Sequence, residues 1–381
     1  MRRLHDTISR LGAMRRMTQA MGPEARASRL DTFSNFGSNP GRLAARFYLP
    51  AALKANAPLV VVLHGCTQTA DVYDQGSGWS TLANQHGFAV LYPEQRRANN
   101  SNLCFNWYSA ADTQRGRGEA LSIRQMVAAM VIKHRLDPSR VFITGLSAGG
   151  AMTSVMLAVY PEVFAGGSII AGLPFGSANS VPEAFERMRG NNAADKNRLS
   201  ELVATASQHR GPWPTISVWH GSSDRIVVPA NADAIVEQWR GAHGVGMTAA
   251  TRETIAGHTR KVWTDASGRE VIEQYVIGGM GHGVPIDTRA DAACGTAGAH
   301  MLEAEICSTR RIAQFWGVAG RTGARTVAQP AAVGEEKARA TKRVAARRER
   351  ANSAHKPRQR AAASHITKVI EDALRAAGLM R

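Results

Sequence analysis

The sequence predicts an α/β fold in which a mostly parallel central sheet carries helices on both faces. Three observations lead to this class. Short apolar runs with the length of buried strands alternate with longer segments of helical pattern. Loops rich in Gly and polar residues follow these runs. The chain has 381 residues, which is long enough for one large domain with extensions, and its hydrophobic content of 44% is ordinary for a globular protein.

The apolar runs and helical segments define the expected elements. Strands are expected over residues 42–49, 58–63, 88–92, 140–144, 166–171, 215–219, 260–264 and 270–277. Helices are expected over residues 78–86, 118–135, 148–159, 195–208, 230–241 and 302–316. No run of 18 uninterrupted apolar residues occurs, so a membrane-spanning helix is not expected.

The net charge of +17 is concentrated at the two ends of the chain. Residues 1–30 hold 7 Lys or Arg against 2 Asp or Glu, and residues 321–381 hold 15 against 5. The residues between them hold 25 against 23, so the charge of this part does not indicate a basic groove. We therefore expect a basic N-terminal extension over 1–30, one globular domain over 31–320 and a basic tail over 321–381.

The C-terminal tail has no Phe, Trp or Tyr and is dominated by Ala, Arg and Lys. Such a segment cannot bury enough apolar surface to offset its chain entropy, so we expect it to be disordered. A short helix is expected over Ile366–Leu379, whose apolar residues share one face. Two hypotheses for the tail stay open. It is a solvated segment without a partner, or a basic arm that binds nucleic acid or an anionic surface.

A tight turn between a strand and a helix carries a serine. The pentapeptide Gly145-Leu146-Ser147-Ala148-Gly149 follows the strand-like residues 141–144 and precedes a run of small residues. Small neighbours permit the strained backbone and close packing of such a turn, which pushes the hydroxyl into open space. Ser147 is therefore the expected nucleophile.

An earlier strand ends where a group that stabilises an oxyanion is expected. The apolar run over 59–63 leads into His64-Gly65-Cys66. Backbone N–H groups after a buried parallel strand can point at a developing alkoxide. We expect the N–H groups of Cys66 and Ala148 to form this oxyanion hole. The alternative interpretation of His64-Gly65 is an ordinary turn at a strand end.

An activated serine needs a carboxylate that orients its histidine, and Asp224 is the expected acid. It lies in the loop that follows the strand-like residues 216–219. Asp233, in an expected helix, and Asp265, in an expected hairpin turn, are the alternatives.

His282 is the expected general base. It lies in a glycine-rich loop after the strand-like residues 271–277, so the chain order is Ser, acid, His. Three other histidines are weighed against it. His220 is expected to hydrogen-bond locally at a strand end, and His258 and His300 lie in segments without a strand-to-loop transition.

Five motifs carry a resemblance to a known family. They are Leu63-His64-Gly65-Cys66-Thr67-Gln68, Cys104-Phe105-Asn106-Trp107-Tyr108, Arg115-Gly116-Arg117-Gly118-Glu119 with Ser122-Ile123, Thr144 through Met152, and Ile170-Ala171-Gly172-Leu173-Pro174. With them the sequence resembles the polyhydroxybutyrate depolymerase family of serine esterases, related to feruloyl and acetylxylan esterases. The resemblance implies an α/β-hydrolase fold for the catalytic domain over 31–320. It also implies a triad of Ser147, Asp224 and His282, and ester hydrolysis without cofactor or metal.

The expected substrates are polyhydroxybutyrate or 3-hydroxyalkanoate oligomers, or short-chain acyl esters. A feruloyl or acetylxylan esterase is the alternative enzyme, and a protein that binds through its basic tail is the alternative from another class. Trp107, Tyr108 and Met280 are expected to contact substrate, although core packing is the competing interpretation for the two aromatic residues. The segment 175–210 is a candidate cap.

Four cysteines fall into two pairs, Cys66 with Cys104 and Cys294 with Cys307. They form two disulfides, or they are reduced thiols of a cytosolic enzyme. Arginines interrupt every apolar stretch near the N-terminus, so a standard secretory signal is not expected. The paired cysteines and the family favour an extracellular or periplasmic location, while the lack of a signal favours the cytoplasm.

Overall fold

The computed structural model describes residues 28–191, 196–247, 249–289 and 293–320. Most of the expected N-terminal extension lies outside these ranges, and so does the expected tail over 321–381 with its terminal helix. The described chain belongs to the domain from its first residues. Leu30 is buried in the core, and the Ser28 hydroxyl donates a hydrogen bond to Asp71.

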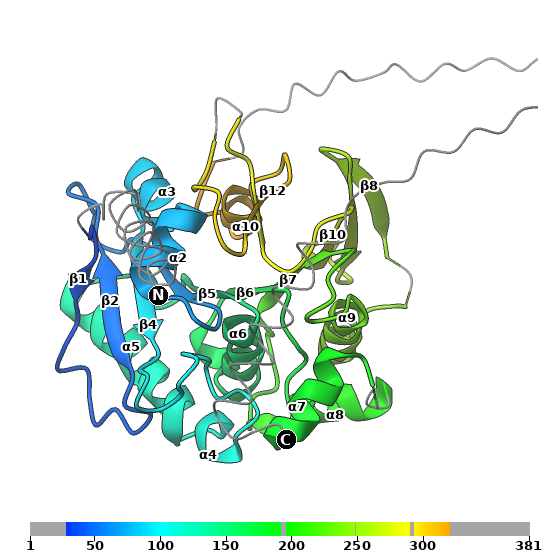
Figure 1. The fold of residues 1–381 in the computed structure, drawn as a ribbon, viewed down its shortest axis with the longest axis horizontal. Helices are drawn as coiled ribbons and strands as arrows, with labels where there is room; N and C mark the ends of the chain where they lie inside the picture. The colour runs from blue at the N-terminus through cyan, green and yellow to red at the C-terminus, as the bar shows by residue number, and fades with distance from the viewer. Residues whose placement is uncertain (1–27, 192–195, 248, 290–292, 321–381) are drawn as a thin grey trace, which may run out of the picture. The chain divides into compact units, whose positions relative to one another are not determined.

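A ten-stranded sheet runs through the domain (Figure 1). In spatial order its strands are β1 (Asp31–Thr32), β2 (Ala44–Tyr48), β4 (Ala89–Glu94), β3 (Leu59–Leu63), β5 (Val141–Leu146), β6 (Gly166–Ile170), β7 (Thr215–Gly221), β10 (Glu270–Ile277), β9 (His258–Thr264) and β8 (Thr251–Ile255). The strands from β4 to β10 in this order are parallel, and antiparallel strands extend the sheet on both sides. The loops after β3, β5, β7 and β10 therefore leave the sheet at one edge.

Two hydrophobic cores cover the two faces of the sheet. Leu59, Val61 and Leu63 of β3 join the first core, while Val60 and Val62 join the second, as the alternation of side chains along a strand requires. The first core contains residues of α5 (Gly118–His134), α6 (Ala148–Val159) and α9 (Ala230–His243). The second contains residues of α2 (Ala70–Ser77), α3 (Trp79–His86) and α10 (Ser308–Phe315). Figure 1 shows α10 and α6 on opposite sides of the strands. The predicted sheet with helices on both faces is confirmed.

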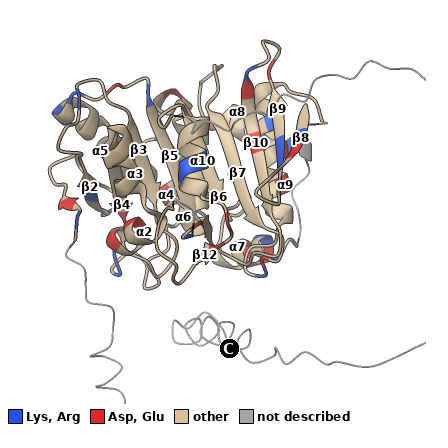
Figure 2. Cartoon of the chain, turned by 90° about the horizontal axis from the view of Figure 1, so that it is seen from above, with Lys and Arg blue, Asp and Glu red and all other residues tan. Residues whose placement is uncertain are grey.

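The strands β3, β5, β6 and β7 contain no Lys, Arg, Asp or Glu. Figure 2 shows the residues of these four types, in blue and red, on other elements. Strands covered on both faces are expected to be apolar throughout. The strands β8, β9 and β10 differ, because Arg260 of β9 forms ion pairs with Glu253 of β8 and with Glu270 and Glu273 of β10.

Shorter elements complete the domain. They are α4 (Ala110–Thr113), the 3-10 helix η1 (Pro161–Val163), α7 (Val181–Met188), α8 (Lys196–Ala206) and the parallel pair β11 (Val284–Ile286) and β12 (Met301–Glu303). The expected cap segment 175–210 thus contains α7 and α8. Gln238 of α9 holds the start of this segment, because its side-chain amide exchanges two hydrogen bonds with the backbone of Phe175.

One predicted helix begins later than expected. Residues 302–316 were predicted as helical, but Met301–Glu303 form β12, and α10 starts only at Ser308. The Cys307 sulfur accepts a hydrogen bond from the Arg310 N–H at 3.2 Å and so caps the helix there. Each of the eight predicted strands has a counterpart. Four further strands, β1, β8, β11 and β12, were not predicted, and β1, β11 and β12 have only two or three residues.

Candidate active site

Ser147 lies at the turn between β5 and α6. Its backbone has a φ of 56° and a ψ of −118°, a conformation that residues other than glycine rarely adopt. Two hydrogen bonds hold the turn. The Ser147 N–H donates to the Ile170 carbonyl at 2.9 Å, and the Ser147 carbonyl accepts from the Ala151 N–H at 2.8 Å. The strain is therefore held by the neighbouring strand β6 and by the first turn of α6.

Glycines flank this turn because the backbone on both sides leaves no room for a Cβ. A Cβ on Gly145 would lie 2.5 Å from the Gly149 carbonyl carbon. A Cβ on Gly149 would lie 2.5 Å from the carbonyl oxygen of His64, in the loop after β3. The small residues thus bring the start of α6 against the loop that contains Cys66.

Asp224 and His282 are joined directly, although 58 residues separate them in the chain. The Nδ1 atom of His282 donates a hydrogen bond to Oδ2 of Asp224 at 2.7 Å. The other carboxylate oxygen accepts hydrogen bonds from the backbone N–H groups of Ile226 at 2.9 Å and Val227 at 3.0 Å. Asp224 is 3% exposed, so this bonding fixes the carboxylate and the imidazole against each other.

The carboxylate of Asp224 stays ionised despite its burial. Burial by itself favours the neutral acid, but hydrogen bonds from His220 and His282 outweigh it and hold the pKa of Asp224 well below its ordinary value. An ionised acceptor at Nδ1 places the proton of a neutral His282 on that atom, which leaves Nε2 free to accept a proton.

His220 also approaches this carboxylate, with Nε2 lying 3.3 Å from Oδ2 of Asp224. The same Nε2 lies 2.7 Å from the Val227 carbonyl oxygen, so it carries a proton and donates it locally. His220 is 2% exposed. The predicted local hydrogen bond at the strand end is confirmed, and His220 acts as a second donor to Asp224.

Ser147 shares a sheet edge with this pair. The strands β5 and β7 are separated by β6 alone, which corresponds to about 10 Å between the loops that follow them. The structure records a hydrogen bond between Asp224 and His282 but, among the described residues, none to the Ser147 hydroxyl. Such contacts are often long in the absence of substrate and tighten in the complex.

The N–H groups expected to bind an oxyanion also lie at this edge. Ala148 is the first residue of α6, where N–H groups point away from the helix without an intrahelical acceptor. Neither the Ala148 N–H nor the Cys66 N–H donates to another residue within the described ranges. The Cys66–Cys104 disulfide, which the sequence left open, is formed in the structure.

Hydrogen bonds of His64 hold the loop of Cys66. The backbone N–H of Gln95 donates to Nε2 of His64 at 3.1 Å, so the proton of this ring is on Nδ1, which donates to the Gly65 carbonyl at 2.8 Å. Burial lowers the pKa of His64 to about 4, against a smaller opposing effect of its bond to Gly65. His64 is therefore neutral near pH 7.

His300 contacts the loop of His282. Its Nδ1 donates to the His282 carbonyl oxygen at 3.1 Å, and the two rings meet edge to face with centroids 5.7 Å apart. The second disulfide, Cys294–Cys307, closes the segment that carries His300. This contact of His300 was not predicted, because a hydrogen bond to a backbone carbonyl leaves no pattern in the sequence.

The three residues expected to contact substrate are mostly covered. Trp107 is 8% exposed, belongs to the first core and meets Tyr108 edge to face at 5.7 Å. Met280 is 7% exposed, and its carbonyl accepts the Ser223 N–H at 3.0 Å, beside Asp224. Their contact with substrate stays a prediction.

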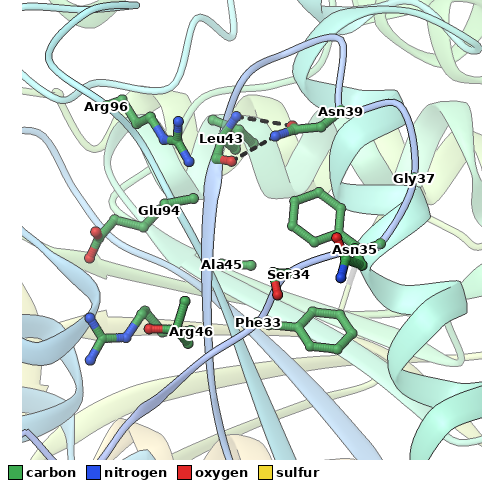
Figure 3. A pocket seen from close by; sticks show the side chains of 13 residues that line it. Phe33, Ser34, Asn35, Gly37, Asn39, Leu43, Ala45, Arg46, Glu94 and Arg96 are labelled. Carbon is green, nitrogen blue, oxygen red and sulfur yellow. Dashed lines mark hydrogen bonds between the residues drawn. The ribbon is translucent and has the colours of Figure 1, made fainter.

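An open cavity of about 380 Å³ lies beside the strand β2 (Figure 3). The Asn39 side chain holds its rim by exchanging two hydrogen bonds with the backbone of Leu43, which Figure 3 draws as dashed lines. Its wall contains Phe33, Arg46 and Glu94 but none of the expected site residues. We assign it no part in the chemistry.

Neither a metal site nor a membrane span is found in the part of the chain that the structure describes. No group of three or more His, Cys, Asp or Glu side chains there is arranged to hold a metal ion. No helix there combines the length and apolar character needed to cross a bilayer.

The fold and this arrangement of side chains define the class of the protein. A parallel sheet with a serine on a strand-to-helix turn, and an Asp–His pair on two later loops, is the architecture of an α/β-hydrolase. Comparison with known families gives the particular group. The chain belongs to the Esterase PHB depolymerase family, whose model matches residues 43–264.

Individual relatives agree with this family. The chain is 50% identical over 293 residues to poly(3-hydroxyalkanoate) depolymerase C of Paucimonas lemoignei, covering 76% of this chain and 70% of the relative. It is 31% identical over 275 residues to feruloyl esterase B of Talaromyces stipitatus, covering 70% and 75% of the two chains. A solved acetyl xylan esterase from Aspergillus awamori matches with a TM-score of 0.65 at 26% identity, over 76% of this chain and 99% of that one. The predicted family is confirmed, and this chain is a carboxylic ester hydrolase.

The neutral state of His64 gives a test through the pH dependence of stability. Its pKa is about 4 in the folded protein and near 6.5 in the unfolded chain. Between these values the unfolded chain binds a proton that the folded protein does not, so stability falls as the pH drops through this window. From pH 7 to pH 5 the free energy of unfolding should fall by about 2 kcal/mol more in the unaltered protein than in the His64→Gln variant. Urea unfolding at both pH values measures the losses, and equal losses would contradict the assignment.

Proposed function

We propose that the protein hydrolyses carboxylic esters by two-step acyl transfer, with Ser147 as nucleophile, His282 as general base and Asp224 as the group that orients it. The observation that carries this proposal is the 2.7 Å hydrogen bond between His282 and Asp224, at the sheet edge where β5 ends in Ser147. A serine hydroxyl becomes an effective nucleophile when such a pair removes its proton.

In the first step the Ser147 oxygen attacks the ester carbonyl carbon while its proton moves to Nε2 of His282. The carbonyl oxygen becomes an oxyanion and accepts hydrogen bonds from the Cys66 and Ala148 N–H groups. His282 then protonates the leaving alcohol, which departs and leaves an acyl group on Ser147. In the second step water takes the place of the alcohol, and the acid product is released. Asp224 keeps its charge throughout and stabilises the imidazolium form of His282.

The proposal is tested by Ser147→Ala. Hydrolysis of p-nitrophenyl butyrate should fall by more than about 10⁴-fold, because binding and the oxyanion donors alone leave only residual catalysis. The thermal unfolding midpoint should hardly change. Initial rates and a thermal melt measure the two quantities.

Ser154→Ala is the matched control, because it removes another hydroxyl of α6, one that donates to the Leu173 carbonyl at 2.8 Å. It should keep turnover within about twofold while losing about 1 kcal/mol of stability. Full activity of Ser147→Ala would remove Ser147 from the mechanism.

We propose 3-hydroxyalkanoate oligomers or short-chain acyl esters as the substrates. The relative with 50% identity, named as a poly(3-hydroxyalkanoate) depolymerase, supports this choice over a feruloyl or acetylxylan ester. The nearly balanced charge of residues 31–320, with 25 basic and 23 acidic side chains, suits an uncharged ester.

A panel of esters tests the substrate proposal. We expect kcat/KM to be highest for 3-hydroxybutyrate oligomers or p-nitrophenyl butyrate, and at least tenfold lower for methyl ferulate and acetylated xylan. Ser147→Ala serves as the blank for each substrate. A preference for methyl ferulate or acetylated xylan would favour the alternative esterases.

We propose a separate binding role for residues 321–381, which lie outside the described residues. Their 15 basic and 5 acidic side chains support electrostatic attraction to an anionic surface or nucleic acid. The full chain should retard a DNA duplex on a gel at low salt and release it as salt rises, while a version that ends at Gly320 should not. Equal retardation of the two proteins, or none, would remove this role.

A further inference from the structure

Glu119 is a buried acid without a role in the proposed mechanism. It lies in the first turn of α5, within the Arg115-Gly116-Arg117-Gly118-Glu119 motif, and is 1% exposed. Burial raises the pKa of Glu119 to about 8, while hydrogen bonds from Asn106 and Gln95 act in the opposite direction. Perturbed carboxylates of this kind gather at functional sites more often than elsewhere.

The carboxylate of Glu119 is surrounded by donors. Its Oε1 accepts hydrogen bonds from the side-chain amide of Gln95 at 2.5 Å and from Nδ2 of Asn106 at 2.9 Å. Its Oε2 accepts from the backbone N–H of Asn106 at 2.9 Å. All three contacts are donated to the carboxyl group, so they favour its ionised form and oppose the effect of burial on its pKa.

Gln95 carries the connection from Glu119 toward the sheet edge. Its Oε1 accepts from the Arg96 N–H at 3.0 Å and from Nδ2 of Asn99 at 2.9 Å, which fixes the orientation of the amide. The Nε2 group that faces Glu119 also donates to the Cys104 carbonyl at 3.0 Å. The backbone N–H of Gln95 donates to Nε2 of His64 at 3.1 Å. Gln95 thus contacts both the partner cysteine of the disulfide and the histidine before Cys66.

The last link runs from His64 to the peptide that contains the Cys66 N–H. Nδ1 of His64 donates to the Gly65 carbonyl at 2.8 Å, and the Gln68 N–H donates to the same oxygen at 3.3 Å. The Gly65 carbonyl and the Cys66 N–H belong to one planar peptide group and point in opposite directions. A bond that fixes the carbonyl therefore fixes the direction of the N–H.

We propose that Glu119 is a positioning residue for the oxyanion hole, acting through Gln95 and His64 to aim the Cys66 N–H at the reacting carbonyl oxygen. The inference rests on the proposed function, because it concerns the same oxyanion. The buried hydrogen bonds from α5 to the loop after β3 should therefore affect kcat. A misdirected donor stabilises the transition state less, while the binding of substrate changes little.

The test is Glu119→Gln, which keeps the size of the side chain but turns one acceptor into a donor that faces another donor. We expect kcat for p-nitrophenyl butyrate to fall about tenfold with KM changed less than twofold, because removal of a whole oxyanion donor costs about 10²–10³ in kcat. Steady-state kinetics at 25 °C separates the two constants. An unchanged kcat would overturn the inference.

Asp74→Asn is the matched control for the loss of a buried carboxylate. Asp74 is 3% exposed and accepts from the Ser80 N–H, the Ser80 hydroxyl and the Tyr92 hydroxyl, none of which contacts the Gly65–Cys66 peptide through a hydrogen bond. It should lower the melting temperature and leave kcat unchanged. An equal fall of kcat in both variants would mean that Glu119 acts only through stability, and would overturn the inference.

Two further measurements complete the design. If Glu119→Gln does not fold, Asn106→Ala replaces it, because it removes the Nδ2 donor and leaves the carboxylate. A fall of kcat at constant KM is then required, and an unchanged kcat overturns the inference. Ser147→Ala is assayed beside these variants, since turnover that survives in it refutes the proposed function, whereas its inactivity with a normal Glu119→Gln refutes only the role of Glu119.

Discussion

The site depends on the close approach of two backbone segments, the start of α6 and the loop after β3. Gly149 lies where a Cβ would stand 2.5 Å from the His64 carbonyl oxygen, so a larger residue would force the helix away from the loop. This contact decides where the Ser147 turn lies and keeps the Ala148 N–H beside the Cys66 loop. The strained φ of Ser147 is maintained because β6 and the first turn of α6 both bond to its peptide groups. Backbone packing therefore precedes any side-chain chemistry in the construction of the site.

Asp224 adds the second constraint. A carboxylate that is 3% exposed would be unfavourable without compensation, and here it receives two backbone N–H groups and two imidazoles. The Nε2–H group of His220 faces the Val227 carbonyl and this carboxylate, and the residue belongs to the strand β7. His282 instead lies in a glycine-rich loop after β10, and in the proposed mechanism it is the imidazole that Asp224 orients. Two histidines near one carboxylate thus differ in role because they differ in the element that carries them.

The sequence predicts those features that local pattern determines. The apolar runs that form β3 and β5, and the Gly-x-Ser-x-Gly turn, are readable because burial and steric limits act on consecutive residues. The strand β8, with the sequence Thr-Arg-Glu-Thr-Ile, was missed because it is an exposed edge strand stabilised by pairing with β9 and by Arg260. β12 was read as helix because its pairing with β11 depends on residues about 17 positions away. The contact of His300 with His282, and the links from Glu119 to His64, join distant loops and follow only from the folded arrangement.

The two sides of the proposed catalytic centre are held by different sets of contacts. The loop of Cys66 is fixed by a disulfide, by a histidine with one tautomer and by a carboxylate that three donors surround. Apolar residues of the same volume could fill this space with equal or greater stability, so stability alone does not account for a buried acid there. Direction does, because an oxyanion donor is effective only if its orientation is set before the reaction begins. The loop of His282 has glycines at 278, 279, 281 and 283, and hydrogen bonds tie it to its neighbours. They run from His282 to Asp224, from His300 to the His282 carbonyl, from the Gly279 N–H to the Ser222 hydroxyl and from the Ser223 N–H to the Met280 carbonyl. In the proposed mechanism His282 serves both the hydroxyl and the leaving alcohol, so these bonds set the position from which its ring reaches both.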